Sequence, residues 1–113
     1  PGFGSGVFGA FDPKTEEWEV IELPDALDQI PYALNIDPKG NIWICGTGND
    51  TMTKFDPKTK EMTEFRMPTR VTYTREIEFD ADGNVWTCNS NAPVRHTERG
   101  KGSFIKIELI ETD

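Results

Sequence analysis

The chain has few basic residues and no long apolar run. Lysine and arginine together number 12, against 20 aspartate and glutamate residues, and the net charge is −8 at pH 7. This balance argues against nucleic-acid binding, which requires a basic surface. No apolar stretch approaches the roughly 20 residues of a transmembrane helix, so we expect a soluble protein without a membrane span. The compartment stays open between the bacterial periplasm and the cytoplasm.

Histidine, cysteine and helical patterning are also scarce. His96 is the single histidine, and Cys45 and Cys88 are the only cysteines. Two cysteines without another cysteine or histidine close by do not make a zinc site. Apolar residues are spaced as in a helix for no more than one turn, at residues 25–30, between two prolines. Strands are therefore the expected elements.

Two interleaved repeats give the strongest signal in the sequence. Residues 34–45 recur 43 positions later at 77–88, sharing the pattern Asp-x-x-Gly-Asn-x-Trp-x-Cys. The run Phe-Asp-Pro-Lys-Thr at 11–15 recurs 44 positions later at 55–59. Apolar and polar residues alternate on both sides of each motif, as in strands. Asp at the first position of the 37–40 and 80–83 turns and Gly at the fourth favour a type I turn.

The repeats predict an all-β fold, a partial β-propeller made of four-stranded antiparallel blades, because four short strands per 40–45 residues are typical of a blade. Residues 1–24 would form the last two strands of one blade, 31–68 a complete blade, and 74–110 the first three strands of another. The alternative is a small independent β-sandwich. The expected strands are 7–11, 18–23, 32–37, 41–46, 52–56, 62–66, 74–80, 84–89 and 104–110.

A propeller closes with roughly four to eight blades, so fewer than three units do not close one. We therefore expect the remaining propeller blades, from the same full-length chain or from other subunits, as partners of this segment. Its outer faces would carry apolar side chains such as Ile21, Leu23, Ile105 and Ile107.

The repeat also bears on the two cysteines. Cys45 and Cys88 hold the same position in successive units, so their side chains point in the same direction around the ring. Packed sheets lie about 10 Å apart, whereas the Cα atoms of a disulfide lie within about 7 Å of each other. We expect both cysteines to be unpaired thiols that are buried between blades.

Strand direction gathers a set of polar residues on one rim of the sheets. The links into each first strand, and the loops between second and third strands, lie opposite the Asp-x-x-Gly turns. One such loop, at 90–103, is long in one unit only, and loops on a rigid scaffold often carry function. The candidate residues for binding a substrate or partner on this rim are Tyr32, Arg75, Glu76, Asn89, Asn91 and Arg95, and His96 lies beside them in the loop.

A resemblance to a known family rests on three segments: Pro-Tyr-Ala-Leu-Asn-Ile-Asp-Pro-Lys-Gly-Asn-Ile-Trp at 31–43, Lys-Phe-Asp-Pro-Lys-Thr at 54–59 and Met-Thr-Glu-Phe-Arg-Met-Pro at 62–68. These segments resemble the virginiamycin B lyases, also called streptogramin lyases, and the likeness covers residues 7–88 well. The resemblance implies a seven-bladed propeller that opens the ester of cyclic streptogramin antibiotics by elimination, with a magnesium ion and a histidine base.

By this resemblance, His96 is the candidate catalytic base and Glu76 the candidate Mg²⁺ ligand. The lyases carry their histidine near the start of an inner strand, where this chain has Pro-Tyr-Ala at 31–33 and Thr-Arg-Glu at 74–76. His96 would therefore have to reach the substrate by another route, or the base lies outside this segment.

Other readings stay open. A propeller without catalysis would bind a protein or a ligand on the same rim. A six-bladed calcium lactonase would need an acidic cluster at the starts of the inner strands, which this chain lacks. For the individual residues, the plain alternatives are an exposed loop histidine at His96 and an ion pair between Glu76 and Arg75.

Overall fold

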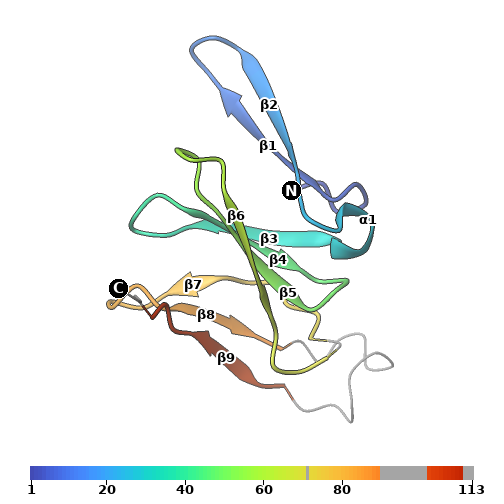
Figure 1. The fold of residues 1–113 in the computed structure, drawn as a ribbon, viewed down its shortest axis with the longest axis vertical. Coiled ribbons are helices and arrows are strands. Elements are labelled where there is room, and N and C mark those ends of the chain that lie inside the picture. Colours follow the sequence, from blue (N-terminus) through green and yellow to red (C-terminus); the bar gives the residue numbers. More distant parts are fainter. Residues whose placement is uncertain (71, 90–101, 111–113) are drawn as a thin grey trace.

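The computed structural model describes residues 1–70, 72–89 and 102–110. These residues form three antiparallel sheets, which follow one another in chain order (Figure 1). The strands are β1 (Val7–Asp12) and β2 (Glu17–Glu22); β3 (Pro31–Ile36), β4 (Ile42–Gly46), β5 (Thr51–Phe55) and β6 (Met62–Arg66); and β7 (Glu78–Phe79), β8 (Val85–Cys88) and β9 (Phe104–Ile107). The predicted grouping of strands as two, four and three is confirmed.

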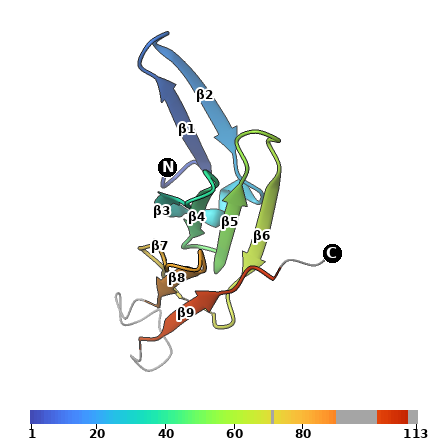
Figure 2. The ribbon, with the colours of Figure 1, turned by 90° about the vertical axis from the view of Figure 1, so that its left-hand side faces the viewer.

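Helix is confined, in the part of the chain that the structure describes, to the single turn α1 (Ala26–Gln29). No described helix has the length and apolar character that crossing a membrane requires. Two predicted strands are shorter than expected, since β7 begins at Glu78 rather than at Thr74 and β9 ends at Ile107. The hairpin β1–β2 extends beyond the second sheet in the side view (Figure 2).

The repeated motif stabilises the turn that joins the first two strands of a blade. The Asp37 carboxylate accepts hydrogen bonds from the backbone N–H and side-chain amide of Asn41 and from the indole N–H of Trp43, each at 2.9 Å. Gly40 closes the turn at φ 89°, which favours glycine because other residues are strained there. Equivalent bonds from Asn and Trp side chains recur in the second copy, at residues 80–86.

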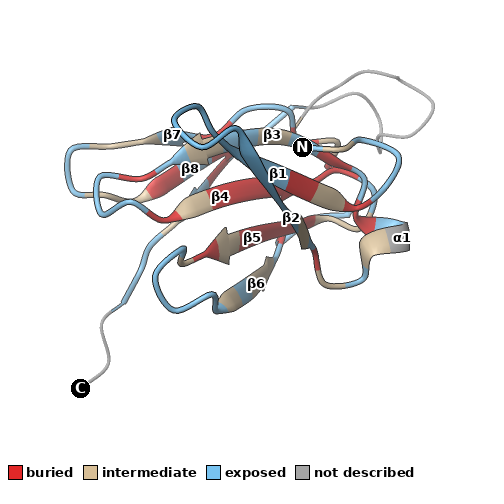
Figure 3. Ribbon diagram, turned by 90° about the horizontal axis from the view of Figure 1, so that it is seen from above, coloured by how far each residue is buried: buried red, intermediate tan, exposed pale blue. Residues whose placement is uncertain are grey.

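Two apolar clusters join the three sheets. Between the first and second sheets, Phe8 and Leu23 pack with Ile44 and Phe55. Between the second and third sheets lies a cluster of seven buried residues: Trp43, Cys45, Met52, Met67, Ile77, Val85 and Ile105. The second sheet is thus covered on both faces, and β4 is buried along most of its length (Figure 3).

The apolar residues predicted to lie on the outer faces were wrongly chosen. Leu23 and Ile105 are buried, and Ile21 and Ile107 pack against the two clusters from their edges. Strand alternation explains this, because Ile21 is opposite Phe8 in the register and shares its inward face. The exposed apolar side chains are instead those of the outward faces, chiefly Phe11, Trp18 and Val20 on the first sheet and Trp86 and Phe104 on the third.

Both cysteines are free thiols, as predicted, but only one of them is buried. Cys45 has no exposed surface, whereas Cys88 is exposed, so the prediction that both are buried is wrong for Cys88. The two positions are equivalent in the repeat, and each lies on the face of its sheet that points away from the preceding sheet. For Cys45 that face is covered by the third sheet, whereas no described sheet covers Cys88.

Candidate functional site

The strand register separates two rims. One row of paired residues crosses the second sheet at the end where β3 begins: Pro31, Gly46, Thr51 and Arg66. Helix α1, the loop 47–50 and the segments 67–70 and 72–77 gather at this end, on the right of Figure 1, and we call it the site rim. The turns 37–41 and 56–61 lie at the opposite end, the turn rim. Tyr32 therefore lies on the predicted side.

Side chains, rather than a strand ladder, hold the segment that enters the third sheet. Residues 72–77 precede β7 and pair with no strand. Three of their backbone carbonyl oxygens accept side-chain hydrogen bonds: Thr74 from Thr47 at 2.8 Å, Glu76 from Thr87 at 2.7 Å, and Ile77 from Asn35 at 2.8 Å. Two of the donors belong to the neighbouring blade, so the predicted strand 74–80 is cut short by contacts between blades.

Tyr73 has an unusual backbone conformation that its neighbours fix. Its φ is 47°, a left-handed value that is uncommon for any residue except glycine and rare for bulky ones. The preceding residue, Thr72, donates from both its N–H and its hydroxyl to one Asp50 oxygen, at 2.7 and 2.8 Å. Thr72 and Thr74 are fully buried, so Tyr73 is anchored on both sides.

Arg75 brings two of the predicted residues together. Its guanidinium carbon lies 5.3 Å from the ring centre of Tyr32 and 4.7 Å from that of Tyr73, within the range of a cation–π contact. The ring of Phe3 meets Tyr32 edge-on at 5.9 Å. The sequence patterns did not identify Tyr73 or Phe3, because neither residue belongs to a repeat. The one signal that could have identified Tyr73 is that it is an aromatic residue close to Arg75 in the sequence.

The structure describes only some of the remaining predicted residues. Glu76 is exposed, and no ion pair joins it to Arg75 within the described residues. Asn89 is half-buried; its N–H donates to the Ser103 carbonyl at 2.8 Å, while its side-chain oxygen is buried without a hydrogen-bond partner in the described structure. Asn91, Arg95 and His96 lie outside the described residues, and their roles stay predictions.

Glu76 does not by itself make a metal centre. Mg²⁺ prefers octahedral coordination by several oxygen atoms, including carboxylates and waters. No group of three His, Cys, Asp or Glu side chains suited to a metal ion occurs in residues 1–70, 72–89 and 102–110. These residues therefore do not fit a complete magnesium site.

Buried Gln29 ties α1 to the second sheet beneath the site rim. Its side-chain amide donates to the Thr53 hydroxyl at 3.2 Å and to a Glu64 carboxylate oxygen at 3.0 Å. Its backbone carbonyl accepts a hydrogen bond from Gly48 at 2.9 Å. The loop 47–50, which anchors the segment carrying Tyr73, is therefore itself supported from below.

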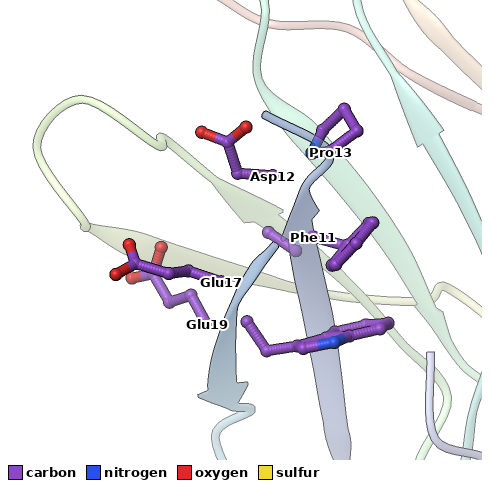
Figure 4. A pocket seen from close by; sticks show the side chains of 7 residues that line it. Phe11, Asp12, Pro13, Glu17 and Glu19 are labelled. Atoms are coloured by element: carbon purple, nitrogen blue, oxygen red, sulfur yellow. The ribbon is translucent and has the colours of Figure 1, made fainter. Parts of the chain in front are cut away.

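Two surface hollows lie away from these residues. One of about 460 Å³ adjoins the tip of the β1–β2 hairpin, where the Phe11 ring and the carboxylates of Glu17 and Glu19 point to different sides (Figure 4). The other, of about 610 Å³, lies at the turn rim beside Phe65 and the turn 81–84. Neither is lined by Tyr32, Arg75 or Glu76.

The three successive antiparallel sheets, with one complete four-stranded unit, define the chain as part of a β-propeller. Solved lyase structures share this fold. A streptogramin B lyase structure matches with a TM-score of 0.74 and 18% sequence identity over 98% of this chain. Selenomethionine-substituted virginiamycin B lyase from Staphylococcus aureus matches with a TM-score of 0.72 and 17% identity over 96% of the chain.

A catalytically inactive variant of the Staphylococcus aureus enzyme, with quinupristin, matches with a TM-score of 0.68 and 19% identity over 93% of the chain. In each case this chain spans 36% of the length of the matched structure. No protein-family model and no curated protein sequence matches the chain. The predicted resemblance is thus confirmed at the level of the fold, and the sandwich alternative is set aside.

Proposed function

We propose that this chain is part of a streptogramin-lyase-like propeller that opens a small cyclic ester by cleaving a carbon–oxygen bond, and that the ligand binds at the site rim. The observation that carries the proposal is the contact between Arg75 and Tyr32, at 5.3 Å. These residues lie near the starts of the first strands of two neighbouring blades, and such positions converge toward the centre of a propeller.

Each predicted residue has a role in this proposal. Tyr32 and Arg75 bind the ligand, and Asn89, Asn91 and Arg95 provide further polar contacts. His96 accepts the proton that an elimination removes from the carbon next to the ester-bearing carbon, and the ester oxygen then leaves as part of a carboxylate. Glu76 would supply one of the several oxygen ligands that Mg²⁺ needs. No step of the proposed elimination is assigned to that ion.

Further blades are the proposed partners of the chain. Trp18 is 71% exposed on the first sheet and Phe104 is 84% exposed on the third, and blades normally bury such faces against their neighbours. Because the chain spans 36% of the matched structures, the activity belongs to the assembled propeller.

The test is to incubate the native protein with quinupristin and to separate the products by liquid chromatography with mass detection. Elimination opens the ring without changing the mass, whereas hydrolysis adds the mass of one water. A new species of unchanged mass is expected, and a hydrolysed product or no product would contradict the proposal. Activity should fall in the Arg75→Ala, His96→Ala double variant and persist in the turn-rim control Lys39→Ala, Lys58→Ala.

A second candidate function is ligand or protein binding without catalysis. It is favoured by the lack of a metal-binding group among the described residues and by exposed tyrosine and arginine, which are frequent in binding hot spots. Calorimetry on the same samples separates the two functions. Quinupristin that binds and is recovered intact would favour the binding module over the lyase.

A further inference from the structure

The Arg75 guanidinium is oriented by aromatic rings rather than by carboxylates. Tyr32 and Tyr73 lie within 5.3 and 4.7 Å of its central carbon. Within the described residues no Asp or Glu forms an ion pair with it, although the chain carries 20 acidic residues. The Arg75 guanidinium also donates no hydrogen bond to another described residue, so its N–H groups stay available to a ligand.

The placement of the Tyr73 ring is maintained against a conformational cost. A left-handed tyrosine is strained, and such strain persists where the surroundings fix it, often at ligand sites. Here the fixing contacts are the two hydrogen bonds from Thr72 to Asp50 and the bond from Thr47 to the Thr74 carbonyl. Packing of the core does not require the ring, because Tyr73 is only half-buried. In this conformation the Tyr73 ring lies beside Arg75.

The surroundings of Arg75 also supply apolar surface. Tyr32 is 46% exposed and its edge-on partner Phe3 is 52% exposed. A guanidinium fixed in this way matches the geometry of a carboxylate, which it binds through two parallel N–H···O bonds. Exposed rings beside it favour a flat apolar group attached to that carboxylate.

We infer that Arg75, Tyr73 and Tyr32 form a subsite for an organic carboxylate with a planar apolar body. The inference rests on the proposed function for its place on the ligand-binding rim, and it names the chemical class that this rim recognises. In a ring-opening elimination the subsite would receive the carboxylate that the reaction releases.

The first test needs no variant. Benzoate, benzamide and acetate are titrated into the native protein, and binding is followed by ligand-observed NMR. Benzamide has the same flat ring without the charge, and acetate has the charge without the ring. Benzoate is expected to bind about tenfold or more tightly than either, since hydrogen bonds to charged groups are the stronger kind. Equal binding of benzoate and benzamide would overturn the inference.

The second test assigns the binding to the three residues. Arg75→Gln and Arg75→Lys should each weaken benzoate binding about tenfold, because neither keeps the planar fork. Tyr73→Phe keeps the ring and should bind normally, whereas Tyr73→Leu should bind more weakly. Arg66→Gln, an exposed arginine on the same rim, is the matched control. Unchanged binding in folded Arg75→Gln protein would refute the assignment.

The two proposals fail in different ways. Binding of benzoate that depends on Arg75, without ring opening of quinupristin, would remove only the lyase activity. Ring opening in a protein that does not distinguish benzoate from benzamide would remove only the carboxylate subsite.

Discussion

At the scale of single residues, two aspartates stabilise the turns of the repeated motif. Burial alone would raise the pKa of Asp37, but hydrogen bonds from Trp43, Asn41 and Lys39 outweigh it and hold that pKa below its ordinary value. The bonds from Trp86 and Asn84 lower the pKa of Asp80 to about 2. Because protein donors already hydrogen-bond to the oxygen atoms of these carboxylates, their role is to close the turn.

The lowered pKa of Asp80 predicts a pH dependence of stability. Its folded-state pKa of about 2 lies below the ordinary 3.8, so its contribution is complete above that value and is lost as the pH falls toward 2. Asp80→Asn should therefore lower the free energy of unfolding more at about pH 5 than at about pH 2.5. Urea unfolding at both pH values measures the difference, with exposed Asp82→Asn as the control. A difference that does not vary with pH would contradict the role given to Asp80.

The two cysteines differ in their chemistry because of their surroundings. Burial raises the pKa of the Cys45 thiol to about 11, although a hydrogen bond with Thr74 partly offsets the effect. The thiolate is the reactive form, and Cys45 also has no exposed surface. Burial thus protects Cys45 in two ways, and Cys88 has no such cover from the described sheets.

We predict that Cys45 resists alkylation in the folded protein. At about pH 8 a thiol of this pKa is ionised in about one molecule per thousand. In the Cys88→Ala variant, iodoacetamide should add no mass to the native protein and one adduct in urea. Rapid labelling of native Cys88→Ala protein would show that Cys45 is accessible.

At the scale of elements, the two Asp-Pro-Lys-Thr turns have one geometry. Each ends in a left-handed residue, Glu16 at φ 59° and Lys60 at φ 63°. Each left-handed residue donates its N–H to the carbonyl of the first turn residue, Asp12 or Asp56, at 2.8 Å. Neither position holds the glycine that such a φ favours. The turns therefore carry strain that a substitution can relieve.

Glu16→Gly is expected to raise the free energy of unfolding by about 0.5–1 kcal/mol. The left-handed conformation costs a residue with a Cβ about 1–2 kcal/mol, and the extra freedom of glycine in the unfolded chain offsets part of the gain. Denaturant unfolding measures the change. The control is Glu17→Gly, one residue later in strand β2, which should destabilise the protein. Equal losses in both variants would contradict the strain argument.

The strands and turns could be predicted because their signals are local. Alternation and the Asp-x-x-Gly and Asp-Pro-Lys-Thr turns lie within a few residues of the elements that they specify. The late start of β7 could not be predicted, because it depends on hydrogen bonds that Asn35 and Thr47 make from another blade. The exposure of Cys88 could not be predicted either, because it depends on whether another sheet packs against the outer face of the third sheet.

The candidate site was predictable only in part. Topology alone put Tyr32 and Arg75 on one rim, and in the structure the Arg75 guanidinium carbon lies 5.3 Å from the Tyr32 ring centre. Tyr73 was missed because its position follows from the pair Asp50 and Thr72, which are 22 residues apart in sequence. No repeat, turn or alternation pattern contains that information.

At the scale of the whole molecule, three sheets pack in a row through two apolar clusters. One exposed ion pair, between Glu19 and Lys60 at 2.8 Å, also links the first two sheets. Such an exposed pair contributes little to stability, so the clusters hold the row together. The second sheet has neighbours on both faces, while the first and third each keep one face open.

Those two open faces predict that the 113-residue chain does not remain a monomer on its own. Trp18 and Val20 are 71% and 68% exposed on one face, and Phe104 is 84% exposed on the other. Burying a side chain of this size gains about 1.5–3 kcal/mol, so copies of the isolated chain should associate through these faces. Light scattering should therefore give a mass above 12.8 kDa. The Trp18→Glu, Phe104→Glu double variant should lower that mass, whereas Lys58→Glu, which changes the net charge by the same amount on the turn rim, should not. A folded 12.8 kDa monomer of the unmodified chain would show that these faces need no cover.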